Sequence, residues 1–224
     1  MVAYGRVPVQ LLRKERLASM KSLCILLFAA ALVPAADWTP LFNGKDLDGW
    51  VMTGPGRFVI EDGAMKTEGG MGLLYYEREK FGNCAIRVVF KVMPGRGNSG
   101  VVVRLPEKPS DPWYGVHNGY EVQIDAAADE WHATGAIYSL AKVTAQPQKP
   151  AGEWNTMEIV LDGPVTRSIL NGVTVMEFDP SQPVPPRKIW YEPVRGPRPD
   201  SGYIGLQNHD PDSTVYFKEV SVRK

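Results

Sequence analysis

Short apolar runs, many of them rich in β-branched residues, recur from residue 37 onward and are separated by Gly, Pro and Asn. Residues 85–92 (AIRVVFKV) and 100–105 (GVVVRL) are clear examples. Apolar runs bounded by such turn residues are typical of β-strands. No part of residues 37–224 shows the spacing of a convincing amphipathic helix. The pattern therefore predicts an all-β protein.

Two dipeptides predict hairpins within this pattern. Asp62-Gly63 and Asn171-Gly172 each separate two strand-like runs, and both dipeptides favour the tight type I′ turn. Other strands are expected at residues 120–125, 134–139, 154–161, 202–208 and 214–222, after a strand-to-turn entry at residues 38–45. About a dozen short strands at regular spacing indicate a sandwich or barrel built from antiparallel sheets.

Two long segments do not fit the strand pattern. Residues 106–119 and 180–201 are rich in Pro and carry Trp113, Trp190 and Tyr191. Loops of this length inside a domain are usually functional or disordered, and the aromatic side chains favour ordered loops. We find no internal domain boundary, and 224 residues suit a single all-β domain.

The first 36 residues are predicted to be a targeting segment, leaving one domain over residues 37–224. Met20-Lys21 precedes an apolar run at residues 23–33, which ends in small residues before Asp37. This is the pattern of a secretory signal, and the run is too short to span a membrane. We therefore expect a secreted or periplasmic protein whose signal starts near Met20. Residues 1–19 would then lie upstream of the true start codon. The alternative is that they form an extended basic N-terminal region of the signal.

Charge and cysteine content change the picture once the leader is removed. The whole chain has a net charge of 0, and residues 1–36 carry five basic side chains and one acidic one, so the remainder is at −4. This balance excludes a basic surface for nucleic acid or anionic lipid. We expect no membrane span in the mature chain. Cys24 leaves with the leader, so Cys84 has no partner for an intrachain disulfide.

The run at residues 120–125 (YEVQID) carries the strongest candidate chemistry. On a strand, Val122 and Ile124 face one side, while Glu121, Gln123 and Asp125 face the other. Two carboxyl groups divide acid and base roles when their environments separate their pKa values. The amide between them can donate to or accept from a sugar hydroxyl. The alternative is a solvent-facing strand with ordinary polar residues.

Further candidates come from isolated polar residues at strand ends. Arg104 follows three valines and could pair with a carboxylate or oxyanion, or simply reach solvent. His209 ends a predicted strand, and histidine is the usual general base near neutral pH, although a lone histidine is often structural. His117 and His132, which flank the acidic strand, are weaker candidates.

The sequence offers little support for metal sites or for a serine hydrolase. No His or Cys pair has metal-ligand spacing, and Asp210, Asp212 and Ser213 match no calcium loop. We predict no cofactor and leave a divalent cation open. A Gly-x-Ser-x-Gly nucleophile elbow is also absent from the sequence.

Six motifs in order resemble the 3-keto-disaccharide hydrolase family, long known only as a domain of unknown function. The resemblance covers essentially residues 37–224. The motifs are LFNGKDLDGW at 41–50, GNSG at 97–100, YEVQID at 120–125, TGAIY at 134–138, EWN at 153–155 and GYIGLQNH at 202–209.

The resemblance implies a fold and a departure from familiar chemistry. The fold is a two-sheet antiparallel jelly-roll sandwich, concanavalin A-like, whose concave sheet binds carbohydrate as in laminarinase-type glycosidases. Those enzymes carry alternating carboxylates on one strand, whereas this chain has Gln123 in the middle position. A retaining glycosidase needs two carboxyl groups about 5 Å apart, so the Gln argues against that mechanism.

The family's association with sugars oxidised at C3 implies another route. The ketone acidifies the C2 proton, so a base can remove it, the C1 substituent leaves, and water adds afterwards. This route assigns acid and base roles among Glu121, Asp125 and His209. The side chains expected to contact or stack on the sugar are Arg104, Gln123, Asn98, Gln207, Trp113, Tyr138 and Trp190.

Two other functions stay open at this point. One is a non-catalytic, lectin-like carbohydrate-binding module, and the other is an ordinary glycosidase acting on unmodified glucans. The sequence does not decide between hydrolysis and elimination, nor does it give the linkage, the aglycone or the oligomeric state.

Overall fold

The computed structural model describes Met1 and residues 37–95, 97–126 and 128–224. The predicted secretory signal, residues 1–36, lies outside the described residues apart from Met1. In these described ranges, no helix is both long and apolar enough to cross a membrane.

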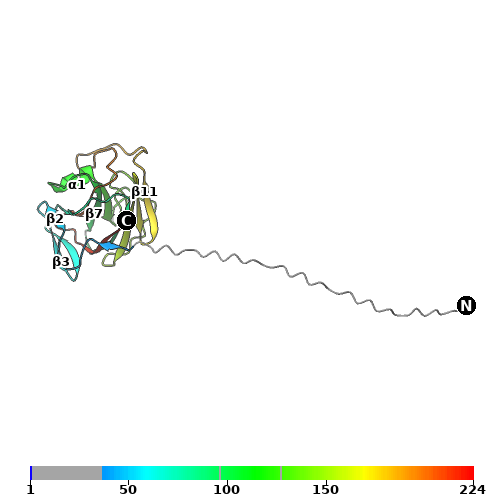
Figure 1. Cartoon of the computed structure of the whole chain (residues 1–224), viewed down its shortest axis with the longest axis horizontal. Coiled ribbons are helices and arrows are strands. Elements are labelled where there is room, and N and C mark those ends of the chain that lie inside the picture. Colours follow the sequence, from blue (N-terminus) through cyan, green and yellow to red (C-terminus); the bar gives the residue numbers. More distant parts are fainter. Residues whose placement is uncertain (2–36, 96, 127) are drawn as a thin grey trace. The chain divides into compact units, whose positions relative to one another are not determined.

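Two antiparallel sheets make up the domain (Figure 1), which confirms the predicted fold class. The larger sheet has the order β11-β10-β9-β6-β13-β4-β3, with β1 also paired to β13, and the smaller has the order β2-β5-β12-β7-β8. The strands of the larger sheet are β1 (Thr39–Pro40), β3 (Arg57–Glu61), β4 (Ala64–Glu68), β6 (Cys84–Val92), β9 (Asn155–Asp162), β10 (Val165–Leu170), β11 (Val173–Phe178) and β13 (Val215–Arg223). Those of the smaller sheet are β2 (Trp50–Thr53), β5 (Gly72–Tyr76), β7 (Asn98–Leu105), β8 (Tyr120–Asp125) and β12 (Tyr203–Asn208).

The main core lies where the apolar faces of the two sheets meet. In β6, alternate residues Ile86, Val88 and Phe90 are fully buried, and in β8 Val122 and Ile124 are equally buried. All five belong to one cluster that draws on both sheets. Successive side chains of a strand face opposite sides of its sheet, so the other face of β8 is turned away from this core. Cys84 is buried and free.

Both predicted hairpins form where the dipeptides stand. Asp62 and Gly63 have φ angles of 51° and 75° between β3 and β4. Asn171 and Gly172 have φ angles of 49° and 83° between β10 and β11. Two consecutive residues with positive φ are what a type I′ turn requires, so the local sequence alone fixes these two connections.

Two local predictions were wrong, and strand β5 was not predicted. A short helix, α1 (Pro112–Asn118), lies in the segment expected to lack regular structure; Asp111 caps it by accepting from the Tyr114 N–H, and Pro opens it. Residues 134–139 form turns, and only Ile137 makes isolated bridges, to Val122 and Ala141. Strand β5 was missed because all five of its residues are buried, which removes the alternation that marks a strand.

Arg104 takes a structural position that corrects its expected role in sugar binding. Its φ of 57° accompanies a register shift between β7 and β12, and the side chain is 1% exposed. The guanidinium donates to the carbonyls of Gly163 (2.7 Å), Val165 (3.1 Å) and Pro199 (3.2 Å) and to the Thr166 hydroxyl (3.3 Å). Arg104 therefore ties β7 to the β9–β10 turn.

Replacing Arg104 is expected to destabilise the domain. Arg104→Lys keeps the charge but cannot reach four acceptors in a planar fork, so buried carbonyls lose their donors. We expect the free energy of unfolding to fall by about 3 kcal/mol in urea titrations. Arg57→Lys is the matched control, because the Arg57 side chain is 69% exposed and forms a surface ion pair with Glu68. This substitution should lower the free energy of unfolding by less than about 0.5 kcal/mol. Equal unfolding midpoints for the two variants would contradict this role.

Candidate functional site

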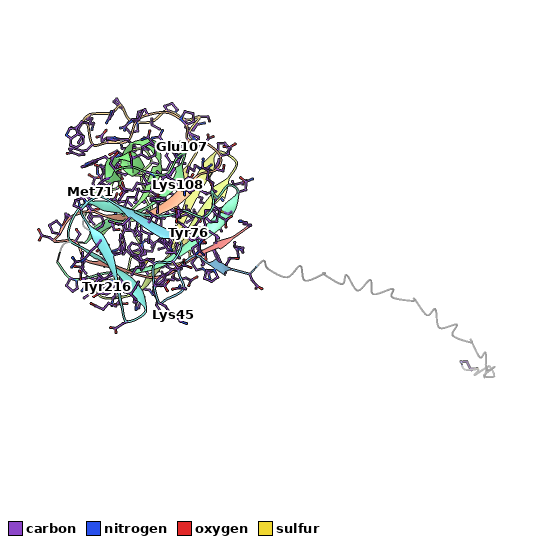
Figure 2. The ribbon with its side chains drawn as sticks, turned by 60° about the vertical axis from the view of Figure 1, so that its left-hand side comes forward. Lys45, Met71, Tyr76, Glu107, Lys108 and Tyr216 are labelled. Atoms are coloured by element: carbon purple, nitrogen blue, oxygen red, sulfur yellow. The ribbon has the colours of Figure 1, made fainter. Side chains whose placement is uncertain are left out.

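A cavity of about 130 Å3 lies on the face of the smaller sheet that points away from the main core. Strands β7, β8 and β12 form its floor, while α1 and the loop at residues 179–202 contribute to its walls. Met71, labelled in Figure 2, directly precedes β5, a strand that contacts α1. The lining residues are Met71, Asn98, Trp113, Val116, Glu121, Gln123, Tyr138, Tyr191, Gln207 and His209.

The register between β7 and β8 builds the floor. Gly100 pairs with Gln123, and Val102 pairs with Glu121. A Cβ atom on Gly100 would lie 2.5 Å from Oε1 of Glu121, closer than two such atoms can approach. Gly100 is therefore the residue that leaves room for the Glu121 carboxyl group over the sheet, which gives the GNSG motif a physical role.

Glu121 has a buried carboxyl group that forms no ion pair with the described residues. It is 5% exposed, and burial raises its pKa to about 8, against a smaller opposing effect of a hydrogen bond with Gln207. Desolvation disfavours the charged form of a carboxyl group. Glu121 is thus mostly protonated at neutral pH and can donate a proton.

Two amide oxygens in the cavity have no hydrogen-bond partner among the residues that the structure describes. Nε2 of Gln123 donates to Oδ1 of Asn98 at 2.8 Å, which fixes the orientation of the Gln123 amide. Within the described part of the chain, Oε1 of Gln123 and Oε1 of Gln207 are buried and accept no hydrogen bond. Leaving a buried acceptor unpaired costs about 1–3 kcal/mol, so both oxygens are suited to accept hydrogen bonds from hydroxyl groups of a ligand.

His209 lines the same cavity and is oriented by its neighbour. Its Nδ1 lies 2.7 Å from Oδ2 of Asp210. Burial raises the pKa of Asp210, but hydrogen bonds from His209, Ser213 and the Asp212 N–H outweigh it and hold the pKa below its ordinary value. An ionised Asp210 accepts the Nδ1–H, so Nε2 of His209 is the nitrogen that can take up a proton.

Aromatic residues form the wall opposite the sheet. Trp113 of α1 packs against Trp190 of the long loop with ring centroids 4.8 Å apart, and Nε2 of His117 lies 3.0 Å from the Trp190 carbonyl oxygen. Figure 1 shows α1 and this loop, drawn in tan to orange, at the same end of the domain. Tyr138 also lines the cavity; burial, with the nearby Glu121 charge, raises its pKa to about 12, so its hydroxyl keeps its proton.

The structure brings together seven of the ten predicted site residues and separates three. Asp125 lies at the end of β8 beside a different cavity of about 90 Å3 that Thr134 and Gln148 also line. Trp190 packs behind Trp113 and is 62% exposed, and Arg104 is bonded elsewhere as described above. The seven that line one cavity are Asn98, Trp113, Glu121, Gln123, Tyr138, Gln207 and His209.

Sequence reasoning missed three residues that line the cavity, Met71, Val116 and Tyr191, and one that orients a lining residue, Asp210. Tyr191 lines the cavity from the long loop, and only its aromatic character in a Pro-rich segment pointed to it. Asp210 was considered only as a calcium ligand. The signal that could have identified its role is its position directly after His209, the candidate base. Across the described residues, no three His, Cys, Asp or Glu side chains are grouped to hold a metal ion.

Comparisons with known proteins agree with this geometry. The chain is 26% identical to a 3-keto-disaccharide hydrolase of Bacteroides thetaiotaomicron over 85% of this chain and 79% of that protein. A candidate glycosyl hydrolase of known structure from Parabacteroides distasonis ATCC 8503 is 27% identical, with a TM-score of 0.69 over 84% of this chain and 99% of that one.

A more distant structure shows the fold alone. The β-glucanase of Bacillus licheniformis is 11% identical, with a TM-score of 0.53 over 86% of this chain and 99% of that one, which places the two sheets among concanavalin A-like jelly rolls. The family model described as the 3-keto-alpha-glucoside-1,2-lyase-like domain matches residues 37–223, so this chain belongs to that family.

Proposed function

We propose that this protein cleaves the C1–O bond of 3-keto-glycosides by elimination, followed by addition of water. The name of the Bacteroides relative and that of the family support the substrate class. The observation that carries the proposal is that a protonated carboxyl group, Glu121, and an Asp-oriented histidine, His209, line the same cavity. An acid and a base with different proton affinities are what elimination requires.

The first step removes the proton at C2 of the sugar. The C3 ketone makes this proton acidic, and Nε2 of His209 takes it, while Asp210 stabilises the resulting imidazolium. Negative charge then develops on the ketone oxygen. Tyr138 lines the cavity, and we assign its hydroxyl, which keeps its proton, to donate a hydrogen bond to that oxygen.

The second step expels the group at C1. The electron pair of the enolate forms the C1–C2 double bond as the C1–O bond breaks, and Glu121 gives its proton to the leaving oxygen. The ionised Glu121 then takes a proton from the water that adds at C1, and His209 returns its proton to C2. The sum is hydrolysis, with both groups restored to their starting states.

The amides and aromatic rings supply binding rather than chemistry. Oε1 of Gln123 and Oε1 of Gln207 would each accept a hydrogen bond from a sugar hydroxyl, which would give these buried oxygens a partner. Trp113 and Tyr191 offer apolar ring faces at the opposite wall. A two-carboxylate glycosidase mechanism is less well supported, because Asp125 lines a different cavity from Glu121.

Deuterium exchange separates the two catalytic roles. In D2O, the wild-type protein should exchange the C2 proton of a 3-keto-α-glucoside and release the alcohol. His209→Asn should lose exchange and cleavage together, whereas Glu121→Gln should keep exchange and accumulate uncleaved, deuterated substrate. NMR follows both signals. Cleavage without deuterium at C2 would contradict elimination, and binding without exchange or cleavage would make the protein a carbohydrate-binding module.

Loss of the Glu121 proton should lower turnover more than binding. Glu121→Gln has nearly the same shape but no transferable proton, so kcat should fall by about 10²–10⁴-fold with a small change in KM. Glu177→Gln is the control, because the Glu177 side chain is 58% exposed and pairs with Arg167 on the larger sheet, away from the cavity lining. Similar kcat values for the two variants would remove Glu121 from the mechanism.

The raised pKa of Glu121 also predicts a pH-dependent stability difference. The folded-state pKa of about 8 exceeds the ordinary 4.5, so the folded protein holds this proton more tightly. The stabilising effect is complete below about pH 4.5 and is lost as pH rises through about 8. Glu121→Gln should therefore unfold at higher temperature than wild type at pH 9 but not at pH 4.5, with a difference of up to roughly 5 kcal/mol. A difference independent of pH would show that Glu121 is not held protonated.

A further inference from the structure

We propose that Ser139, His132 and Asp129 form a second hydrolytic site, with Ser139 as the nucleophile toward short-chain carboxylic esters. Nε2 of His132 lies 3.0 Å from Oγ of Ser139, and Nδ1 of His132 lies 2.9 Å from Oδ1 of Asp129. A nucleophile and a base within hydrogen-bond distance, with the base oriented by a third group, is the arrangement that activates a serine hydroxyl.

The turn that follows β8 holds the three side chains in place. The Asp129 carbonyl accepts from the N–H groups of His132 (3.0 Å) and Ala133 (2.7 Å), and its carboxylate accepts from the Trp131 N–H at 2.8 Å. His132 is thus anchored through its backbone as well as its ring. The ring also packs beside Tyr138, with centroids 5.2 Å apart.

Ser139 has the backbone strain found at many nucleophiles. Its φ is 54°, a left-handed conformation that costs a non-glycine residue about 1 kcal/mol or more. Hydrogen bonds maintain it: its N–H donates to the Trp131 carbonyl at 3.3 Å, and its carbonyl accepts from Arg195 at 3.4 Å. A sharp turn at a reactive serine is therefore present without the sequence of a nucleophile elbow.

All three residues line a cavity of about 270 Å3 that is distinct from the Glu121 cavity. Arg195 lines it as well but is committed to Glu192 at 2.8 Å. Lys188 also lines the cavity and makes no ion pair within the described residues. In this proposal its ammonium group stabilises the oxyanion, and Trp131 and Pro185 contribute apolar surface for a short acyl group.

The reaction balances with water as the second reactant. Oγ of Ser139 attacks the ester carbonyl carbon as its proton passes to Nε2 of His132, and the carbonyl oxygen becomes an oxyanion. Collapse of this intermediate breaks the ester C–O bond, and His132 returns the proton to the leaving alcohol. Water then attacks the acylated Ser139 with His132 as base, which releases the carboxylic acid and restores the hydroxyl.

The exposure of Asp129 sets the expected size of each effect. Its side chain is 64% exposed and that of His132 is 37% exposed, so solvent weakens the Asp–His interaction. Asp129→Asn should lower the rate of ester hydrolysis by about 10-fold, whereas His132→Gln should lower it by about 100-fold or more, since it removes the general base.

The test uses 4-nitrophenyl acetate and a fluorophosphonate that labels activated serines. The wild-type protein should hydrolyse the ester and gain one adduct, which peptide mass spectrometry places on Ser139. Ser139→Ala should lose both signals, and Ser181→Ala, altered in an exposed loop, should keep both.

The test of the second site does not depend on the folding of any single variant. The adduct is mapped on the wild-type protein, and His132→Gln provides an independent loss of labelling with Ser139 intact. No adduct at Ser139, or ester hydrolysis equal in wild type and a folded Ser139→Ala protein, would overturn the second site and leave the triad as a structural hydrogen-bond chain. Neither assay contains a keto sugar, so failure here is distinct from failure at the Glu121 cavity.

Discussion

The alternation of β8 between two environments is the constraint on which the rest of the structure depends. One face of the strand places Val122 and Ile124 in the main core, and the pleat then requires Glu121 and Gln123 to face the other way. A shift of one residue in the β7–β8 register would put a carboxyl group and an amide into the hydrocarbon core. Burial of the two apolar side chains therefore fixes where the polar ones stand.

The polar face of β8 is also nearly closed to water, so the groups of the Glu121 cavity lower the stability of the folded protein. Glu121 and Gln123 are 5% and 3% exposed, and two amide oxygens of the cavity have no partner among the described residues. Such groups lower the stability of the unliganded fold. The core between the sheets supplies the compensating burial, so the domain can hold a neutral carboxyl group and unpaired acceptors ready for a ligand.

One turn connects the two proposed sites. Residues 129–139 return to β8, where the Tyr138 N–H donates to the Glu121 carbonyl at 3.0 Å and the Gln123 N–H donates to the Ala136 carbonyl at 2.9 Å. Tyr138 lines the Glu121 cavity, and Ser139, the next residue, lines the other. Because these two consecutive residues line different cavities, a movement of this turn would change the shape of both cavities.

The sequence by itself determined the features that depend on local rules. Turn dipeptides fixed two hairpins, alternation in β8 separated core from cavity residues, and the motif order led to the family. Tertiary structure decided what depends on contacts between distant segments. It kept Arg104 out of the Glu121 cavity, with a register shift between β7 and β12 at this position. It also placed Asp125 beside another cavity and packed Trp113 of α1 against Trp190. It also brought Ser139 to His132 through a turn with no strand periodicity. Periodicity reports which side of a strand a residue faces, but only packing decides which cavity that side borders and which partners lie there.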